Sequence, residues 1–196
     1  MKSPTSTLRL VFDLATIAIG GALTAGLVHI VSILIVPLYA SNDAFARLSA
    51  LGPVNATIAL PQASPESRLV PFGDPAVAVA FCRYDLRNGP LRVKAPAARY
   101  EYSSLSFHTN RGGIFYALTD RAAAQGQFDA LVATDEQLRA IASRESEDEP
   151  SQDLRIVSPT YEGFVMMRAF SEAPSLYPLA QARTRGLKCQ PEAPQS

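Results

Sequence analysis

The chain has 196 residues, and its 18 Lys+Arg are balanced by 18 Asp+Glu. Lys2, Arg9 and Asp13 are the charged residues that precede a long apolar run, so the net charge of the remaining sequence is close to zero. That remaining sequence also has no cluster of Lys and Arg. A nucleic-acid binder needs a basic surface to displace the counterions of phosphates. The composition therefore argues against nucleic acid as a partner.

Residues 14–42 contain no Asp, Glu, Lys or Arg, and the apolar stretch extends to Tyr39. About 20 apolar helical residues span the roughly 30 Å hydrocarbon core of a bilayer. A cleaved signal peptide has an apolar region of only about 7–15 residues, followed by small residues at the cleavage site. This stretch is longer, and Leu38-Tyr39-Ala40 has a bulky residue where a small one is needed. We therefore expect an uncleaved transmembrane helix at 14–39, with the lipid bilayer as a partner.

The charges that flank this stretch predict its orientation. Lys2, Arg9 and the amino terminus precede it, whereas Arg47 follows it, and the more positive flank stays in the cytoplasm. Residues 1–13 are then cytoplasmic. In a bacterium, the helix lies in the inner membrane and the C-terminal part of the chain faces the periplasm.

Beyond the helix, the prolines of residues 40–71 predict a linker. Residues 76–86 are apolar on both alternating faces over most of their length, as expected for a central strand that is covered on both sides. Asn88-Gly89-Pro90 is a turn signal, and residues 91–95 alternate apolar and cationic side chains like a half-exposed partner strand.

Further elements follow along the chain. Asn110-Arg-Gly-Gly113 predicts a hairpin between strands at 100–109 and 114–119, and Thr134-Asp-Glu-Gln137 fits the capping box of a helix that ends near Ser143. We also expect strands at 128–133, 154–158 and 163–170, a last helix at 175–186, and a disordered tail at 190–196.

These strands come mostly in neighbouring hairpins, without an alternating strand–helix rhythm. The pattern predicts an α+β protein, in which one N-terminal transmembrane helix precedes a mostly antiparallel, sandwich-like β domain with short helices at 72–189.

Several short segments of the domain occur in a familiar order: Phe72-Gly-Asp-Pro75, Cys82-Arg-Tyr-Asp-Leu86, Tyr102-Ser-Ser-Leu-Ser-Phe107, Ile114-Phe-Tyr-Ala-Leu-Thr-Asp-Arg121 and Glu162-Gly-Phe-Val165. With the single N-terminal span, they resemble the short membrane-anchored members of the bacterial family called domain of unknown function 1254, over Val70 to Cys189. Larger relatives join this domain to a second one, domain of unknown function 1214. The resemblance implies a bacterial envelope protein whose partner carries that complementary domain, and it implies no reaction.

Cys82 and Cys189 are the two cysteines of the chain, and both follow the apolar stretch. In an oxidising compartment they can form a disulfide that holds the last helix against the sheet. The alternative is two unrelated thiols, one of them buried as a small apolar residue. With His108 they do not complete a four-ligand zinc site, and we expect no metal and no cofactor. The acidic segment 145–153 lacks the glycine and the spacing of a calcium loop, which favours a solvated loop.

Ser106, His108 and Asp120 are the residue types of a hydrolase, in which a base activates the nucleophile and a third group orients the base. On a strand, Ser106 and His108 share one face, but no G-x-S-x-G segment presents the serine. We therefore assign no catalytic residue. If the protein is an enzyme, His108 and Asp85 are the candidates.

Arg83 and Asp85 project to one side of their strand, where Arg168 or Arg121 can join them. In one interpretation, Arg83 and Arg168 bind a carboxylate or a sugar. In the other, which we favour, the charges form cross-strand ion pairs at the end of a sheet.

Together these features predict a non-enzymatic, single-pass membrane protein whose extracytoplasmic domain binds or assembles with another envelope protein. The alternative is an envelope enzyme that acts on a lipid or a carbohydrate through residues near His108 and Asp85. A third interpretation is a small-ligand module with an apolar pocket beside Arg83.

Overall fold

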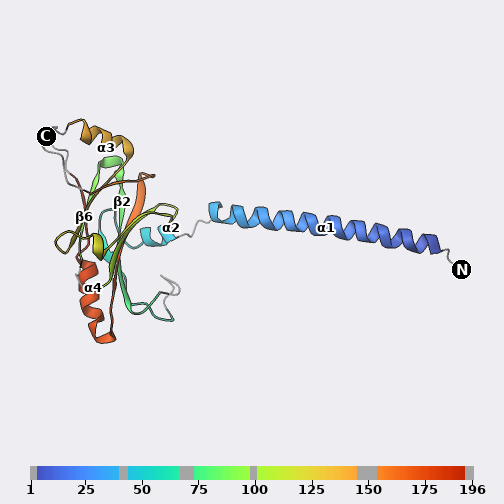
Figure 1. Ribbon diagram of the computed structural model, residues 1–196, viewed down its shortest axis with the longest axis horizontal. Coiled ribbons are helices and arrows are strands. Elements are labelled where there is room, and N and C mark those ends of the chain that lie inside the picture. The colour runs from blue at the N-terminus through green and yellow to red at the C-terminus, as the bar shows by residue number, and fades with distance from the viewer. Residues whose placement is uncertain (1–3, 40–43, 67–72, 98–100, 145–153, 193–196) are drawn as a thin grey trace. The chain divides into compact units, whose positions relative to one another are not determined.

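Figure 1 shows the computed structural model of the protein, which describes residues 4–39, 44–66, 73–97, 101–144 and 154–192. The chain divides into two units, residues 1–41 and 42–196. Phe72, Tyr100, the acidic segment 145–153 and the last four residues of the predicted tail lie outside the described residues.

The first unit is a single long helix, α1 (Pro4–Tyr39). Its apolar part, Leu8–Val36, has a mean hydropathy of 2.2 and none of its side chains is buried within the unit. This helix is long and apolar enough to serve as a membrane anchor. The predicted span at 14–39 lies inside it, and α1 begins earlier, at a proline, which is well tolerated in the first turn of a helix.

One side of α1 is hollowed by small side chains. Gly20, Gly21 and Ala25 line this groove, with Thr24 and His29 beside them. Thr24 Oγ1 donates a hydrogen bond to the carbonyl of Gly20, four residues earlier, at 2.9 Å. The hydroxyl is therefore satisfied within its own helix.

The second unit is a sandwich of two β-sheets with short helices around it (Figure 1). The first sheet has five strands in the order β1 (Thr57–Ala59), β2 (Val77–Asp85), β8 (Glu162–Phe170), β4 (Ser103–Thr109) and β5 (Ile114–Thr119). The second has four, in the order β7 (Leu154–Val157), β6 (Gln127–Ala133), β3 (Leu91–Pro96) and β9 (Lys188–Pro191).

All neighbouring strands of the five-stranded sheet are antiparallel, and so are the β3–β6 and β3–β9 pairs of the other. The exception is the parallel β6–β7 pair. Parallel neighbours need a crossover connection, and here the crossover contains α3 (Asp135–Ala142). The predicted α+β class, with an apolar helix followed by a mostly antiparallel domain, is confirmed.

The main core lies between the two sheets. Every second residue of β2, β4 and β8 points into it, because successive side chains of a strand alternate between the faces of a sheet. The largest fully buried side chains include Tyr84, Phe107 and Phe128, and each is at most 1% exposed. Further members come from both sheets and from the residue just before β9: Leu91, Val93, Leu105, Val132, Ile156, Val165, Met167 and Leu187.

A second apolar cluster covers part of the outer face of the five-stranded sheet. The helix α2 (Ala44–Ser49) packs Phe45 and Leu48 against Phe81 of β2 and Phe164 of β8. Both α2 and β1 belong to residues 40–71, which the prolines predict to be a linker. Within this segment, residues 44–60 are packed on the domain, because their apolar side chains cover the outer face of β2 and β8.

Two expectations about strand pairing are wrong. β3 is not the hairpin partner of β2: the short 3-10 helix η1 (Leu86–Asn88) and Gly89, with φ of 127°, carry the chain across to the other sheet. Most pairs also join strands far apart in sequence, such as β2 with β8, whereas β4 and β5 form the predicted hairpin.

The helices begin where their sequences indicate. The Thr134 side chain accepts a hydrogen bond from the N–H of Gln137, whose side chain accepts one from the N–H of Thr134, so the predicted capping box is confirmed. The last helix, α4 (Tyr177–Arg185), is preceded by η3 (Pro174–Leu176), and β9 extends to Pro191, inside the segment expected to be a disordered tail.

Candidate functional site

Polar side chains gather on the outer face of the five-stranded sheet, where β4 and β8 lie side by side. Ser104, Ser106 and His108 occupy alternate positions of β4, and Ser104 lies opposite Arg168 of β8. The two serines and the histidine are at most 9% exposed. This row of buried polar groups beside a cation is the candidate site.

Ser106 and His108 are in direct contact. Ser106 Oγ lies 2.9 Å from His108 Nε2, and His108 Nδ1 lies 3.2 Å from the carbonyl oxygen of Gly112. A carbonyl only accepts, so Nδ1 is the protonated nitrogen of the neutral ring and Nε2 is an acceptor for the serine hydroxyl. The same hydroxyl also lies 3.3 Å from the carbonyl oxygen of Met166, which competes for its proton. The arrangement has the order nucleophile, base and orienting group.

The histidine ring is held firmly and kept neutral. It stacks on Phe164 with 4.4 Å between the ring centroids and an interplanar angle of 12°. Burial lowers the pKa of His108, opposed by the hydrogen bond to Gly112, and the nearby Arg168 charge lowers the pKa further. A neutral imidazole that accepts from a hydroxyl is the form a general base requires.

Asp120 has no part in this cluster. His108 lies opposite Ile114 at one end of β5, whereas Asp120 follows Thr119 at the other end. The five steps from Ile114 to Thr119 correspond to about 17 Å of strand. The group that orients the histidine is therefore the Gly112 backbone, which a search for side-chain triads does not detect.

Asp85 is engaged in a local network at the end of β2. Its carboxylate accepts from the backbone N–H of Arg87 at 3.0 Å and pairs with the Arg87 guanidinium at 3.1 Å. Arg87 also pairs with Glu162 at 2.7 Å. The partner of Asp85 is thus Arg87, two residues along the chain, and no ion pair of Asp85 with Arg83, Arg168 or Arg121 is present among the described residues. The structure does not bring Asp85 to His108.

Arg83 and Arg168 lie on the same face but not in one site. Arg83 is opposite Phe164 on β8, four residues from Arg168, which is about 13 Å along the strand. Arg83 Nε is buried and has no hydrogen-bond partner in the described part of the chain. Arg168 Nη1 donates to Ser106 Oγ at 3.3 Å, so Arg168 alone joins the polar cluster.

A buried tyrosine supports the site from the core side. The Tyr84 hydroxyl lies 3.1 Å from Ser158 Oγ and 3.4 Å from the His108 carbonyl oxygen. Burial raises the pKa of Tyr84 to about 12, and the Ser158 hydrogen bond opposes that shift. Gly163 makes room for this contact, because a Cβ there would overlap both Tyr84 and the His108 carbonyl. The sequence holds one signal of this arrangement that is absent from the expectations above, because a glycine inside a strand pattern indicates a close approach.

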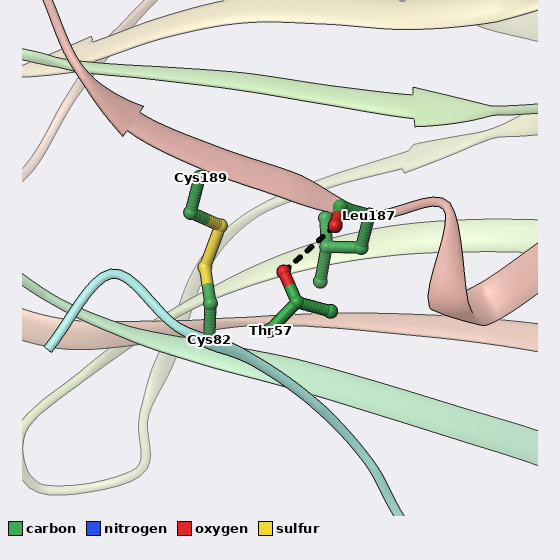
Figure 2. Close-up of a disulfide and its surroundings, with 4 residues drawn as sticks. All are labelled: Thr57, Cys82, Leu187 and Cys189. Carbon is green, nitrogen blue, oxygen red and sulfur yellow. Dashed lines mark hydrogen bonds between the residues drawn. A yellow bond between two sulfur atoms is a disulfide. The ribbon is translucent and has the colours of Figure 1, made fainter. Parts of the chain in front are cut away.

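A disulfide joins the two sheets between Cys82 of β2 and Cys189 of β9, with 6.6 Å between the Cα atoms (Figure 2). Beside it, Thr57 Oγ1 donates a hydrogen bond to the Leu187 carbonyl oxygen at 2.7 Å. The disulfide thus attaches β9, the last strand, to β2 of the five-stranded sheet. Within the described residues, no group of three or more His, Cys, Asp and Glu side chains is placed to hold a metal ion.

The sandwich and its motifs can be compared with known proteins. The family model described as "Protein of unknown function (DUF1254)" matches residues 54–191. The chain belongs to this family. The resemblance deduced from the five segments of the sequence is therefore confirmed, and the match extends further toward the N-terminus, over β1.

Two solved structures are similar to this chain. The VPA0106 protein from Vibrio parahaemolyticus has a TM-score of 0.52 and 12% identity over 76% of this chain and 34% of that chain. A putative uncharacterized protein from Burkholderia cenocepacia has a TM-score of 0.46 and 11% identity over 78% of this chain and 42% of that one. This chain spans less than half of either protein, and the Vibrio match shows a shared fold alone. No curated protein matches the chain.

Proposed function

We propose that this DUF1254 protein is a single-pass bacterial inner-membrane protein that holds its sandwich domain in the periplasm, where the domain binds another envelope protein. The observation that carries the proposal is the combination of α1 with the Cys82–Cys189 disulfide. Disulfides persist in oxidising compartments such as the periplasm and are rare in the cytosol. The positive charges at Lys2 and Arg9 agree with a cytoplasmic N-terminus.

The binding role rests on the length of the similar structure. In the Vibrio protein the matching region is 34% of the chain, so a comparable sandwich there belongs to a longer polypeptide. The family resemblance implies that larger relatives join such a sandwich to a complementary domain. In this proposal, the sandwich of the present protein binds such a domain on another envelope protein.

Reporter fusions test the location. Alkaline phosphatase, which is active only in the periplasm, and a green fluorescent reporter, which is active only in the cytoplasm, are each fused after residue 196. We expect phosphatase activity and no fluorescence. The Lys2→Gln/Arg9→Gln variant removes the positive flank and should lower the phosphatase signal. Fluorescence from the unaltered chain with no phosphatase activity would refute the location.

Reciprocal purification tests the assembly. The full chain is tagged and isolated in mild detergent, and any bound protein is identified by mass spectrometry. We expect a second envelope protein with the complementary domain, which recovers this chain when it carries the tag itself. Recovery of the chain as a lone monomer in several detergents would contradict the proposal.

The envelope enzyme remains a second candidate because of one observation, the 2.9 Å contact between Ser106 and His108. A serine whose proton is accepted by histidine can attack the ester of a lipid or a carbohydrate. A fluorophosphonate probe should then label the full chain at Ser106, and His108→Ala should abolish labelling. A chain that is not labelled, or a His108→Ala variant that fully complements a deletion strain, would exclude this candidate.

A further inference from the structure

Arg168 differs from two other partly buried arginines in what balances its charge. Arg92 and Arg183 are also partly buried, and each forms an ion pair with a glutamate, Glu192 and Glu101 respectively. No carboxylate of the described residues forms an ion pair with Arg168, which is likewise partly buried. A guanidinium stays protonated at physiological pH, so an unbalanced positive charge lies on the outer face of the five-stranded sheet.

This charge is held in place by the polar cluster. Arg168 Nη1 donates to Ser106 Oγ at 3.3 Å, and Ser106 is itself hydrogen-bonded to His108. One of the five guanidinium N–H groups is thereby used, and the others remain as donors. A side chain that is already positioned loses less conformational entropy when a ligand binds.

Two further residues with hydroxyl groups lie near Arg168. Ser104 is the residue of β4 opposite Arg168, and Tyr102, 56% exposed, precedes β4. Burial lowers the pKa of Arg168, so the charge is partly withdrawn from water, and the nearby ionisable Tyr102 opposes this shift. At such a position the attraction for an anion is stronger than in bulk solvent.

Arg83 is less suited than Arg168 to bind an anion. Its Nε is closed off from solvent, and the apolar side chains of Phe81, Phe164 and Met166 lie on the same face between it and Arg168. The accessible, positioned cation of this face is therefore Arg168.

We propose that Arg168 is the recognition point of an oxyanion-binding site, in which its guanidinium binds the carboxylate or phosphate of a small ligand. Ser104 and Tyr102 supply further hydrogen bonds to the anion. The site does not depend on the proposed partner protein or on catalysis by Ser106. It gives the outer face of the sheet a ligand-binding role of its own.

Thermal unfolding of the full chain in mild detergent tests the site, with sodium phosphate and sodium acetate compared against sodium chloride at constant ionic strength. An anion at ten times its dissociation constant should raise Tm by about 3–5 °C. Arg168→Gln should abolish the rise. Arg168→Lys keeps the charge but loses the planar fork, and should weaken binding at least about 10-fold. A response to phosphate alone identifies a phosphate site, and a response to acetate alone identifies a carboxylate site.

Arg121→Gln is the matched control, because it removes the same charge from an exposed position and should keep the full response. An unaltered chain whose Tm does not depend on either anion would overturn the proposal, and so would an Arg168→Gln variant that keeps the response. Near-UV circular dichroism shows whether each variant is folded. If Arg168→Gln is not folded, the affinity of Arg168→Lys decides: a loss supports the site and an unchanged affinity refutes it.

Discussion

Removal of the Cys82–Cys189 disulfide should cost the domain a large part of its stability. The bond closes a loop with a sequence separation of 107. In the chain-entropy model, a loop of about 100 residues contributes about 4.7 kcal/mol by restricting the unfolded chain. Typical domains have a free energy of unfolding of about 5–15 kcal/mol, so the Cys82→Ala/Cys189→Ala variant should be close to the limit of folding.

The assay is thermal and urea unfolding of the full chain in detergent, with and without dithiothreitol. At about 2–4 °C per kcal/mol, the loss of the bond should lower Tm by about 9–19 °C. Reduction of the unaltered protein should produce a similar shift, whereas the double variant should not respond to the reductant. A shift below about 3 °C in both experiments would show that the disulfide does not restrain the unfolded chain as this reasoning assumes.

Three further changes probe the supporting elements. Gly163→Ala should destabilise the domain by about 3 kcal/mol or more in a urea titration, because the added Cβ would overlap Tyr84 and the His108 carbonyl. Gly113→Ala should be nearly neutral in the same titration, because its Cβ would only approach Thr109 at 3.5 Å. Thr134→Ala removes the helix cap and should cost about 1 kcal/mol, whereas Thr134→Ser should restore most of it. Burial lowers the pKa of His108 from its ordinary 6.5, so as the pH falls the unfolded chain binds the proton before the folded chain does. The free energy of unfolding should therefore be highest above pH 6.5 and decline as the pH falls below that value. This decline should be smaller in His108→Gln, and an identical pH profile for the two proteins would contradict the reasoning.

The alternation of apolar residues locates most strands, because the burial of one sheet face follows directly from a period of two. It does not tell which sheet a strand joins. The pattern of residues 91–95 is that of a half-buried strand in either sheet, and β3 (Leu91–Pro96) pairs with β6 and β9 because η1 redirects the chain. Long-range pairing of this kind depends on the packing of the whole sandwich.

The candidate site is predictable in the same partial way. The spacing of Ser106 and His108 correctly indicates a shared face, and the structure adds that they are hydrogen-bonded. The orienting group is a backbone carbonyl, that of Gly112, which any residue type can provide. For that reason, no side-chain motif in the sequence predicts which group orients His108. Among the described residues, Arg168 likewise has no carboxylate partner because of the β4–β8 register, which the pattern of the sequence does not reveal.

The disulfide has a consequence for the way the protein matures. Cys82 is synthesised long before Cys189, and β9 can complete the sandwich only after residue 191 has been made. Since the chain has two cysteines, one bridge is possible within it, so oxidation requires no shuffling among alternative pairs. The incorrect product is an intermolecular disulfide, formed when two chains meet before Cys189 of either has been synthesised. A high local concentration of nascent chains would favour such dimers.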